Sequence, residues 1–188
     1  RSRATLAALL LAAASPLAAQ TPPLDVPLAF VGEATGSAHQ GAEQGLAEAQ
    51  LQGEFLGQRY RLDASPAEAV AIVAALPAAE LEALAAAHPS VPVLNVAAND
   101  DALRDRCRPN LFHVLPSARM AADALAQWHK AHPEAQDVAA RAWHPAFERY
   151  AASQLNKRYT EQFKLPMDDL AWAGWAAVKL VSDTVARE

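Results

Sequence analysis

The side chains best suited to bind a small molecule follow three short apolar runs of the sequence. Polar loops at 33–39, 97–101 and 116–119 come directly after these runs. Ligands of open α/β sheets bind outside the carboxyl ends of the strands, so these loops are where a solute would be held. Their hydroxyl and amide groups offer uncharged hydrogen bonds, and their carboxylates could meet a cation or an amine. The candidate ligand-binding residues are Glu33, Thr35, Ser37, Asn99, Asp100 and Ser117. The alternative is that these side chains only build loops and helix caps, as Ser, Asn and Asp commonly do.

No pattern in the sequence points to catalysis or to a metal. The stretch 32–36 is neither a nucleophile elbow nor a dinucleotide-binding loop. Cys107 lies between two arginines, but no neighbouring histidine marks it as a nucleophile. His129 and His132 have helical spacing, yet Pro133 interrupts the element and solvated surface histidines are the simpler reading. We therefore predict a protein that is not an enzyme, with no catalytic residue, no metal ligand and no cofactor.

Length and composition restrict the class of protein further. The chain of 188 residues is long enough for one domain, and a quarter of it is alanine, which suits a core of closely packed helices. A single cysteine excludes an internal disulfide. The net charge of −5 leaves no basic patch for phosphates, so nucleic acid is excluded as a partner.

The first nineteen residues have the order of a secretory signal peptide. Arg1 and Arg3 precede an apolar run at 4–14, and small residues come before Gln20. The run is too short to cross a bilayer as a helix. We expect cleavage after Ala19, an extended lead-in at 20–27 and a periplasmic location.

Strands and helices alternate through the body of the sequence. Strands are predicted at 28–31, 58–63, 91–96 and 111–115, and helices at 41–56, 77–88 and 117–130. The segment 65–76 stays open: Ser65-Pro66 and Glu68 form a helix-start signature, whereas Val70, Ile72 and Val73 are β-branched. The pattern predicts an α/β fold with a doubly wound, mainly parallel sheet of about four to five strands.

The C-terminal part has a different character. Trp143, Phe147, Tyr150 and Leu155 predict one helix, and the Trp172 region predicts a second. We expect an α/β lobe over 28–140 and a C-terminal helical pair over 141–188 that packs on the same lobe.

Several segments of the sequence resemble the type I periplasmic binding proteins. Together they resemble a branch of substrate-binding proteins of ABC transporters found with pyrroloquinoline-quinone (PQQ)-dependent alcohol dehydrogenase systems. The resemblance covers most of the chain after the signal peptide, and its motifs indicate the family more strongly than they indicate a ligand. It is carried by the segments 41–47, 53–60, 75–81, 99–104, 107–113 and 166–168.

Two departures from this family affect what the resemblance implies. Family members close two lobes on a ligand, whereas here the helix near Lys130 leads almost directly to segments typical of the family's C-terminus. The second lobe is therefore expected to be missing. The family also places a crossover helix and a third strand within the span that 63–76 occupies here, and this segment is too short for both.

The resemblance implies a solute-binding or accessory role in a transporter linked to quinoprotein alcohol oxidation. The solute would be a quinone cofactor, an alcohol-derived compound or a small acid, and the partner an ABC permease or a quinoprotein dehydrogenase component. A homodimer could rebuild a two-lobed cleft. The alternative is a protein interaction module that has lost small-molecule binding, with Trp172 and Trp175 exposed to contact the partner.

Overall fold

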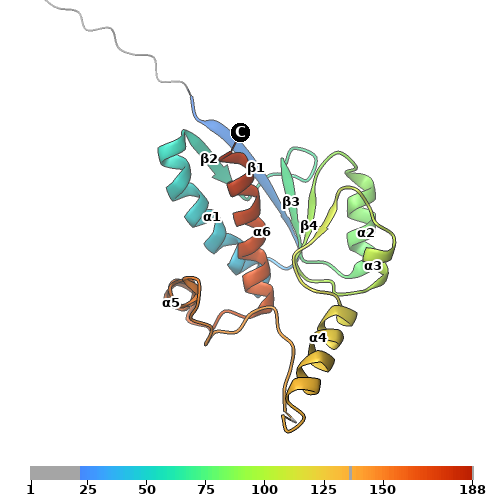
Figure 1. Cartoon of the computed structure of the whole chain (residues 1–188). Coiled ribbons are helices and arrows are strands. Elements are labelled where there is room, and N and C mark those ends of the chain that lie inside the picture. The colour runs from blue at the N-terminus through green and yellow to red at the C-terminus, as the bar shows by residue number, and fades with distance from the viewer. Residues whose placement is uncertain (1–21, 136, 188) are drawn as a thin grey trace, which may run out of the picture.

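The computed structural model describes residues 22–135 and 137–187, and its centre is one parallel sheet. The five strands have the order β2-β1-β3-β4-β5, and every adjacent pair runs in the same direction (Figure 1). The strands are β1 (Leu24–Val31), β2 (Gln58–Arg61), β3 (Ala71–Ala74), β4 (Val93–Asn95) and β5 (Leu111–His113). The helices are α1 (Ser37–Leu56), α2 (Ala78–Ala87), α3 (Ala102–Asp105), α4 (Ala118–Ala131), α5 (Ala152–Phe163) and α6 (Asp169–Val185). The predicted fold class is confirmed, including the C-terminal helices.

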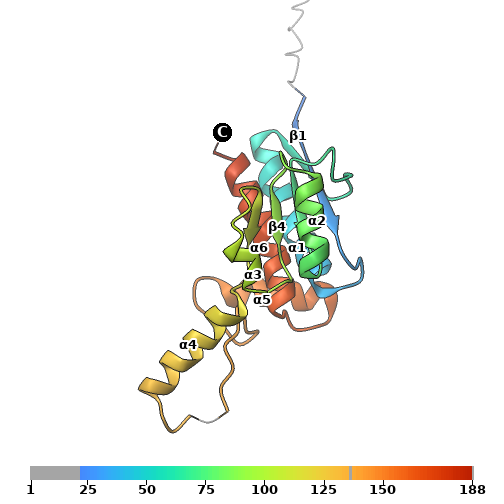
Figure 2. The same cartoon turned by 90° about the vertical axis from the view of Figure 1, so that its right-hand side faces the viewer.

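Helices lie on both faces of this sheet. Helices α1 and α6 cover one face, and α2 and α3 cover the other (Figures 1 and 2). Neighbouring strand residues point to opposite faces, so Leu28 and Val73 pack toward α1 and α6, while Ala29 and Ile72 pack toward α2. All four side chains are buried, which explains why these strands read as continuous apolar runs.

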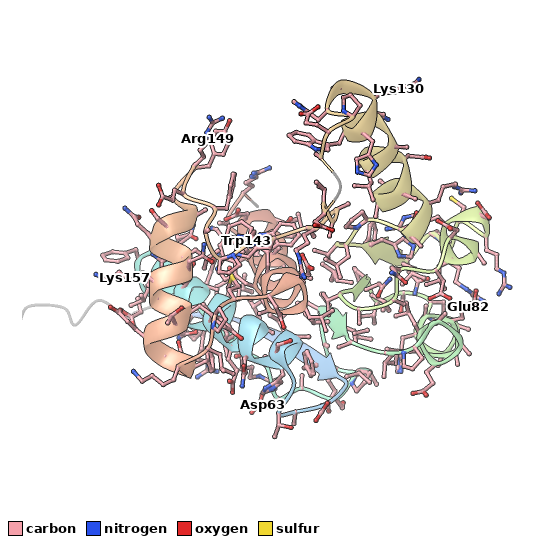
Figure 3. The ribbon with its side chains drawn as sticks, turned by 90° about the horizontal axis from the view of Figure 1, so that it is seen from below. Asp63, Glu82, Lys130, Trp143, Arg149 and Lys157 are labelled. Carbon is pink, nitrogen blue, oxygen red and sulfur yellow. The ribbon has the colours of Figure 1, made fainter. Side chains whose placement is uncertain are left out.

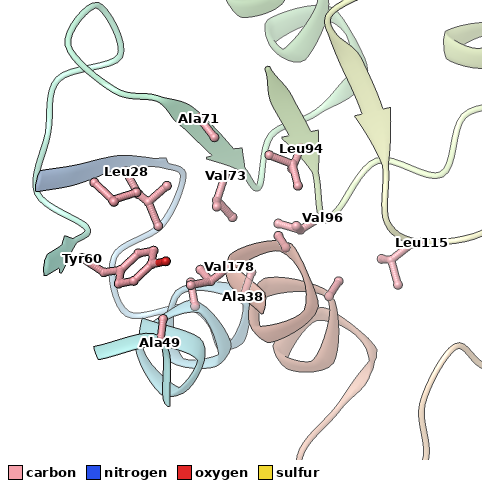
Figure 4. Close-up of a cluster of buried hydrophobic side chains, with 14 residues drawn as sticks. Leu28, Ala38, Ala49, Tyr60, Ala71, Val73, Leu94, Val96, Leu115 and Val178 are labelled. Carbon is pink, nitrogen blue, oxygen red and sulfur yellow. The ribbon is translucent and has the colours of Figure 1, made fainter. Parts of the chain in front are cut away.

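Glycines allow α1 and α6 to pack at very short range. A Cβ added to Gly41 would fall on the carbonyl of Ala171, and one added to Gly174 would fall on the carbonyl of Ala38. At Gly45 the same atom would lie 2.9 Å from the Trp175 carbonyl oxygen. Figure 4 shows the buried cluster beneath this helix pair, with Val178 and Ala38 facing Val73 and Leu28. These glycines therefore bring the two helix backbones close together.

Within the segment 65–76, residues Ala71–Ala74 form the strand β3 after a turn, and no crossover helix joins β2 to β3 in the described segment 62–70. Residues Leu24–Pro27 of β1 align with β2, and Leu28–Val31 align with β3 on its other side. Because β3 starts level with the end of β2, the chain does not have to return along the sheet, as an ordinary parallel crossover must. The segment 62–70 passes across β1, held by bonds from the Val70 N–H to the Pro27 carbonyl (2.8 Å) and from the Ala64 N–H to the Leu28 carbonyl (3.1 Å).

Other predicted boundaries are corrected by the structure. Strand β1 starts at Leu24, inside the predicted lead-in, and α1 starts at Ser37, inside the predicted loop. The predicted helix at 143–155 is wrong over most of its length, because α5 begins at Ala152. Tyr150 and Ala151 have φ values of 56° and 64°, in the left-handed region that ends a right-handed helix. The short helix α3 was not predicted, and the predicted signal peptide lies outside the described residues.

Candidate functional site

The carboxyl ends of β4 and β5 open onto a hollow of about 270 Å³. Asn99 and Ser117 both line it, so the structure brings together two predicted residues from different loops. Arg141 and Asp169, from the segment before α5 and the start of α6, line it as well. The remaining lining is largely apolar and includes Ala97, Leu115, Pro116 and Leu170. The hollow therefore combines an amide, a hydroxyl, a guanidinium and a carboxylate on an apolar wall, which are the elements of a polar-solute site.

Asn95, the last residue of β4, fixes the loop that carries Asn99. Its Oδ1 accepts from the N–H groups of Ala97 (3.1 Å) and Ala98 (2.9 Å). Its Nδ2 donates to the Ala98 carbonyl (2.7 Å) and lies 3.0 Å from Nδ1 of His113 on β5. The side chain is 1% exposed, so these bonds replace all contact with water.

The loop before α4 is held by a second set of polar contacts. Ser117 is buried and caps α4, because its Oγ accepts from the Met120 N–H at 3.2 Å. A hydrogen bond from the Ser117 side chain is the main cause that lowers the pKa of Asp101, with further contributions from Arg119 and Arg104. The Ala118 N–H donates to the Asn99 carbonyl at 2.8 Å, which joins the two loops. The hydroxyl of Ser117 is therefore engaged within the chain.

The ion pair between Arg141 and Asp169 lines another side of the hollow. Arg141 Nη1 lies 3.4 Å from Asp169 Oδ2, and Asp169 Oδ1 accepts from the Trp143 N–H at 2.7 Å. The arginine side chain remains 58% exposed. A solute carboxylate could therefore reach this guanidinium from solvent without a large rearrangement.

The other predicted ligand-binding residues do not line this hollow. Glu33 and Thr35 are exposed on the loop after β1, where the Thr35 hydroxyl donates to Glu33 Oε1 at 3.1 Å. Ser37 is half-buried at the start of α1, and Asp100 is exposed beside Asn99. Their role in binding stays a prediction.

The two tryptophans predicted to contact a partner are partly buried against the chain itself. Trp172 stacks on Trp143 with ring centroids 5.8 Å apart, and Trp175 Nε1 donates to Glu48 Oε2 at 3.0 Å. Glu48 also binds Arg158 at 2.8 Å, which links α1, α5 and α6. In Figure 3 Trp143 lies between the α5 and α6 ribbons, whereas Lys130 marks the far end of α4.

Three functional-site residues were not selected from the sequence. Arg141 lies in a segment with no periodic signal, and Asp169 reads as an ordinary first-turn acid of α6. Asn95 lies at the end of an apolar run, and this polar interruption was the one available signal.

Within 22–135 and 137–187, no group of three or more His, Cys, Asp or Glu side chains could hold a metal ion. No helix in the same ranges is long and apolar enough to cross a membrane. Cys107 is an exposed free thiol, and His132 pairs with Glu134 at 3.7 Å.

Comparison with known proteins gives a clear result at the level of the fold. No family model matches the sequence, and no curated protein matches it. Two solved structures do match, both described as an ABC transporter substrate-binding protein from Desulfitobacterium hafniense. One has a TM-score of 0.72, and the other, a complex with Leu, has a TM-score of 0.62. Each is 11% identical to this sequence, and each alignment covers 88% of this chain and 84% of the other. This chain therefore shares its fold with these two substrate-binding proteins.

Proposed function

We propose that this protein is a non-enzymatic, periplasmic solute-binding protein that works with an ABC permease. The observation that carries the proposal is the hollow at the carboxyl ends of β4 and β5, where Asn99 and Ser117 face Arg141 and Asp169. The likeness to substrate-binding proteins supports it, because it gives the same sheet and flanking helices.

The lining supports a small solute that carries a carboxylate. Arg141 is the cation of the hollow, and its partner Asp169 lies at 3.4 Å, a distance that leaves the guanidinium free to exchange partners. The Asn99 amide and the apolar wall would hold the rest of the solute. One structural neighbour was solved in complex with Leu, a molecule of this size and charge class.

The link to quinoprotein alcohol oxidation rests on the sequence resemblance. It places PQQ, alcohol-derived compounds and small acids among the solutes to be tested. It also makes a quinoprotein dehydrogenase component a candidate partner beside the permease. The short path from α4 to α5 supports the loss of a second lobe, which a homodimer could replace.

The test is a thermal-shift and calorimetric titration of the purified chain. The panel is PQQ, short alcohols and aldehydes, small carboxylic acids and leucine. A ligand that binds only the folded state stabilises it by about 2.7 kcal/mol at a hundredfold excess over Kd. A monomer that leaves its solute open on one side should bind at micromolar Kd or weaker.

Two pairs of variants locate the site. Arg141→Gln and Asn99→Ala should abolish the response to the acid that binds, because both side chains line the hollow. Arg149→Gln is the matched control, since Arg149 is exposed and outside the hollow. Thr35→Ala and Glu33→Gln test the loop after β1, and a loss of binding there alone would move the site to that loop. A flat response across the panel would contradict the proposal.

A second candidate function is a protein interaction module that has lost small-molecule binding. The observation that favours it is the exposure of α4. This helix buries none of its residues, and its apolar side chains Met120 and Trp128 are about half exposed. Trp172 and Trp175 keep partial exposure and remain candidate contacts. Capture of the permease by the wild type, lost in Trp128→Ala or Trp175→Ala, together with a flat solute panel, would favour this function.

A further inference from the structure

The conformation at the end of β4 depends on a hydrogen bond that only the neutral form of His113 can accept. Asn95 uses its Oδ1 to accept from the N–H groups of Ala97 and Ala98. This fixes which amide atom is the oxygen and which the nitrogen, because only the oxygen can accept. The Asn95 Nδ2 then points at His113 Nδ1, 3.0 Å away, and this ring nitrogen must act as the acceptor. The bond therefore requires the neutral tautomer of His113, with its proton on Nε2.

Protonation of His113 would place two donors against each other. An imidazolium carries N–H groups on both nitrogens, so Nδ1–H would face the Asn95 amide, which carries only hydrogens on that side. Asn95 cannot turn its amide around, because its oxygen would then leave two backbone N–H groups without a partner. Either the ring must rotate away or the Asn95 side chain must move, and both changes break the lock on residues 96–99.

The charges that face His113 also favour its neutral form. Arg104 of α3 acts on the ring as a like charge, and its guanidinium donates to the Leu115 carbonyl beside β5. Asp101 lies near Arg104, but its carboxyl is engaged by Ser117 and Arg119. Among the described residues the ion pairs of histidine are those of His39 and His132, so no carboxylate pairs with His113.

We propose that protonation of His113 unlocks the loop of residues 96–99 and so weakens the solute site at the ends of β4 and β5 in acid. The coupling reaches both walls of that site, because the Asn99 carbonyl accepts from the Ala118 N–H at the start of α4. The loop switch stands on the Asn95 and His113 contacts alone, whereas its effect on solute binding rests on the proposed function.

The direction of the pH effect follows from the pKa. Burial, followed by the charge of Arg104, lowers the pKa of His113 below its ordinary value of 6.5. A histidine with a lowered folded-state pKa contributes stability above the ordinary value, and this contribution is lost as the pH falls through the folded-state pKa. The loop is therefore locked at neutral pH and opens in mild acid.

The experiment follows the ligand-free protein by NMR from about pH 8 to about pH 5, the range of histidine titration. We expect His113 to carry its proton on Nε2 at neutral pH. As the pH falls and His113 becomes protonated, the protection of the Ala97 and Ala98 amides against hydrogen exchange should fall about tenfold. A single hydrogen bond is worth about 1 kcal/mol, and more when a donor is left unpaired. The Val73 amide, in the centre of the sheet, is the internal control.

The variant His113→Asn separates the switch from general acid damage. An asparagine side chain can present an oxygen near the position of Nδ1, and this oxygen does not titrate. The loop should then stay protected across the whole pH range. A proton on Nδ1 at neutral pH, an unchanged loop in the acidified wild type, or an equal loss of protection in His113→Asn would each overturn the proposal. If no solute of the panel raised the melting temperature, the proposed function would be contradicted, but the pH-dependent change of the 96–99 loop would still be expected.

Discussion

Helices α6 and α4 lie in opposite surroundings. Both are rich in alanine and both carry tryptophan. Helix α6 packs beside α1 on one face of the sheet, whereas α4 projects from the body in two perpendicular views (Figures 1 and 2). Helix α6 buries Ala171, Ala173, Gly174, Ala177, Val178 and Ser182, and α4 buries none of its residues. Alanine content alone therefore does not decide whether a helix is buried.

The difference in burial between α6 and α4 comes from the segments that each helix packs against. Glycines at matching positions of α1 and α6 remove the side-chain atoms that would hold the two backbones apart. Helix α4 has an apolar side with Leu125 and Trp128, and these side chains line an open hollow of about 240 Å³ together with the segment 138–141. Close packing thus stabilises α6, whereas α4 is stabilised mainly by local interactions.

The largest expected effect is at the glycine contacts of α6. Gly174→Ala or Gly41→Ala adds one methyl group where a backbone carbonyl already lies, so the helices must separate. We expect a loss of about 3 kcal/mol or more in the free energy of unfolding, at the upper end of overpacking effects. Chemical denaturation measures it. The matched control is Ala126→Leu on exposed α4, which adds more atoms and should change stability by about 0.5 kcal/mol or less.

Truncating a tryptophan in each helix sharpens the same comparison. Trp172→Ala removes a ring that stacks on Trp143 and packs against the buried cluster formed by Leu155, Tyr159, Met167 and Ala171, so we expect a loss of about 2 to 3 kcal/mol. Trp128 is 48% exposed, and Trp128→Ala should cost less than about 1 kcal/mol. Equal midpoint shifts for the two variants would show that α4 is packed in solution.

Alkaline pH should affect the side of the molecule that carries α6. Tyr159 of α5 is 1% exposed and donates to Gln40 Oε1 of α1 at 3.0 Å. Burial, with a smaller contribution from Asp168, raises the pKa of Tyr159 to about 12. A raised pKa means that stability is present below the ordinary value of 10.0 and is lost as the pH rises toward 12. Denaturation curves at increasing pH should show this loss, and Tyr159→Phe should remove that part of the pH dependence.

The smallest expected effects are at the two helix caps. Asp168 Oδ1 accepts from the Ala171 N–H at 2.7 Å, and Ser117 Oγ accepts from the Met120 N–H at 3.2 Å. Removing either side chain should cost about 1 kcal/mol locally. For Asp168→Ala this cost should appear in the global free energy of unfolding, because α6 is part of the core. For Ser117→Ala we expect mainly faster hydrogen exchange within α4, and a global loss equal to that of Asp168→Ala would contradict the comparison.

Most of the strands could be predicted from local patterns: β1 and β4 from apolar runs, β2 from alternation, and β5 from an apolar run of which Leu111 is buried. The run at 28–31 forms the second half of β1, and the runs at 91–96 and 111–115 contain β4 and β5. The loops after β4 and β5 contain Asn99 and Ser117, which line the same hollow. The residues that complete the hollow, Arg141 and Asp169, could not be selected, because sequence spacing does not show that two distant segments meet.

Local rules failed where a distant partner outweighed them. The signature at Ser65 does form a turn, with Ser65 Oγ bonded to Glu68 Oε2 at 2.9 Å, but the chain then enters the sheet between β1 and β4. Strand pairing on both sides of Ala71–Ala74 satisfies more backbone groups than a short isolated helix could. At 143–151 the helical spacing of Trp143 and Phe147 reflects contacts with Trp172 and with each other across a loop.

The sequence by itself determined the fold class, the approximate positions of four of the five strands and the polar loops at their ends, since burial periodicity and turn chemistry are local properties. Only the tertiary structure decided the strand at 71–74, the exposure of α4 and the pairing of Asn95 with His113. Each of these depends on which segments lie side by side, and that is fixed by backbone pairing and close packing between residues far apart in the chain.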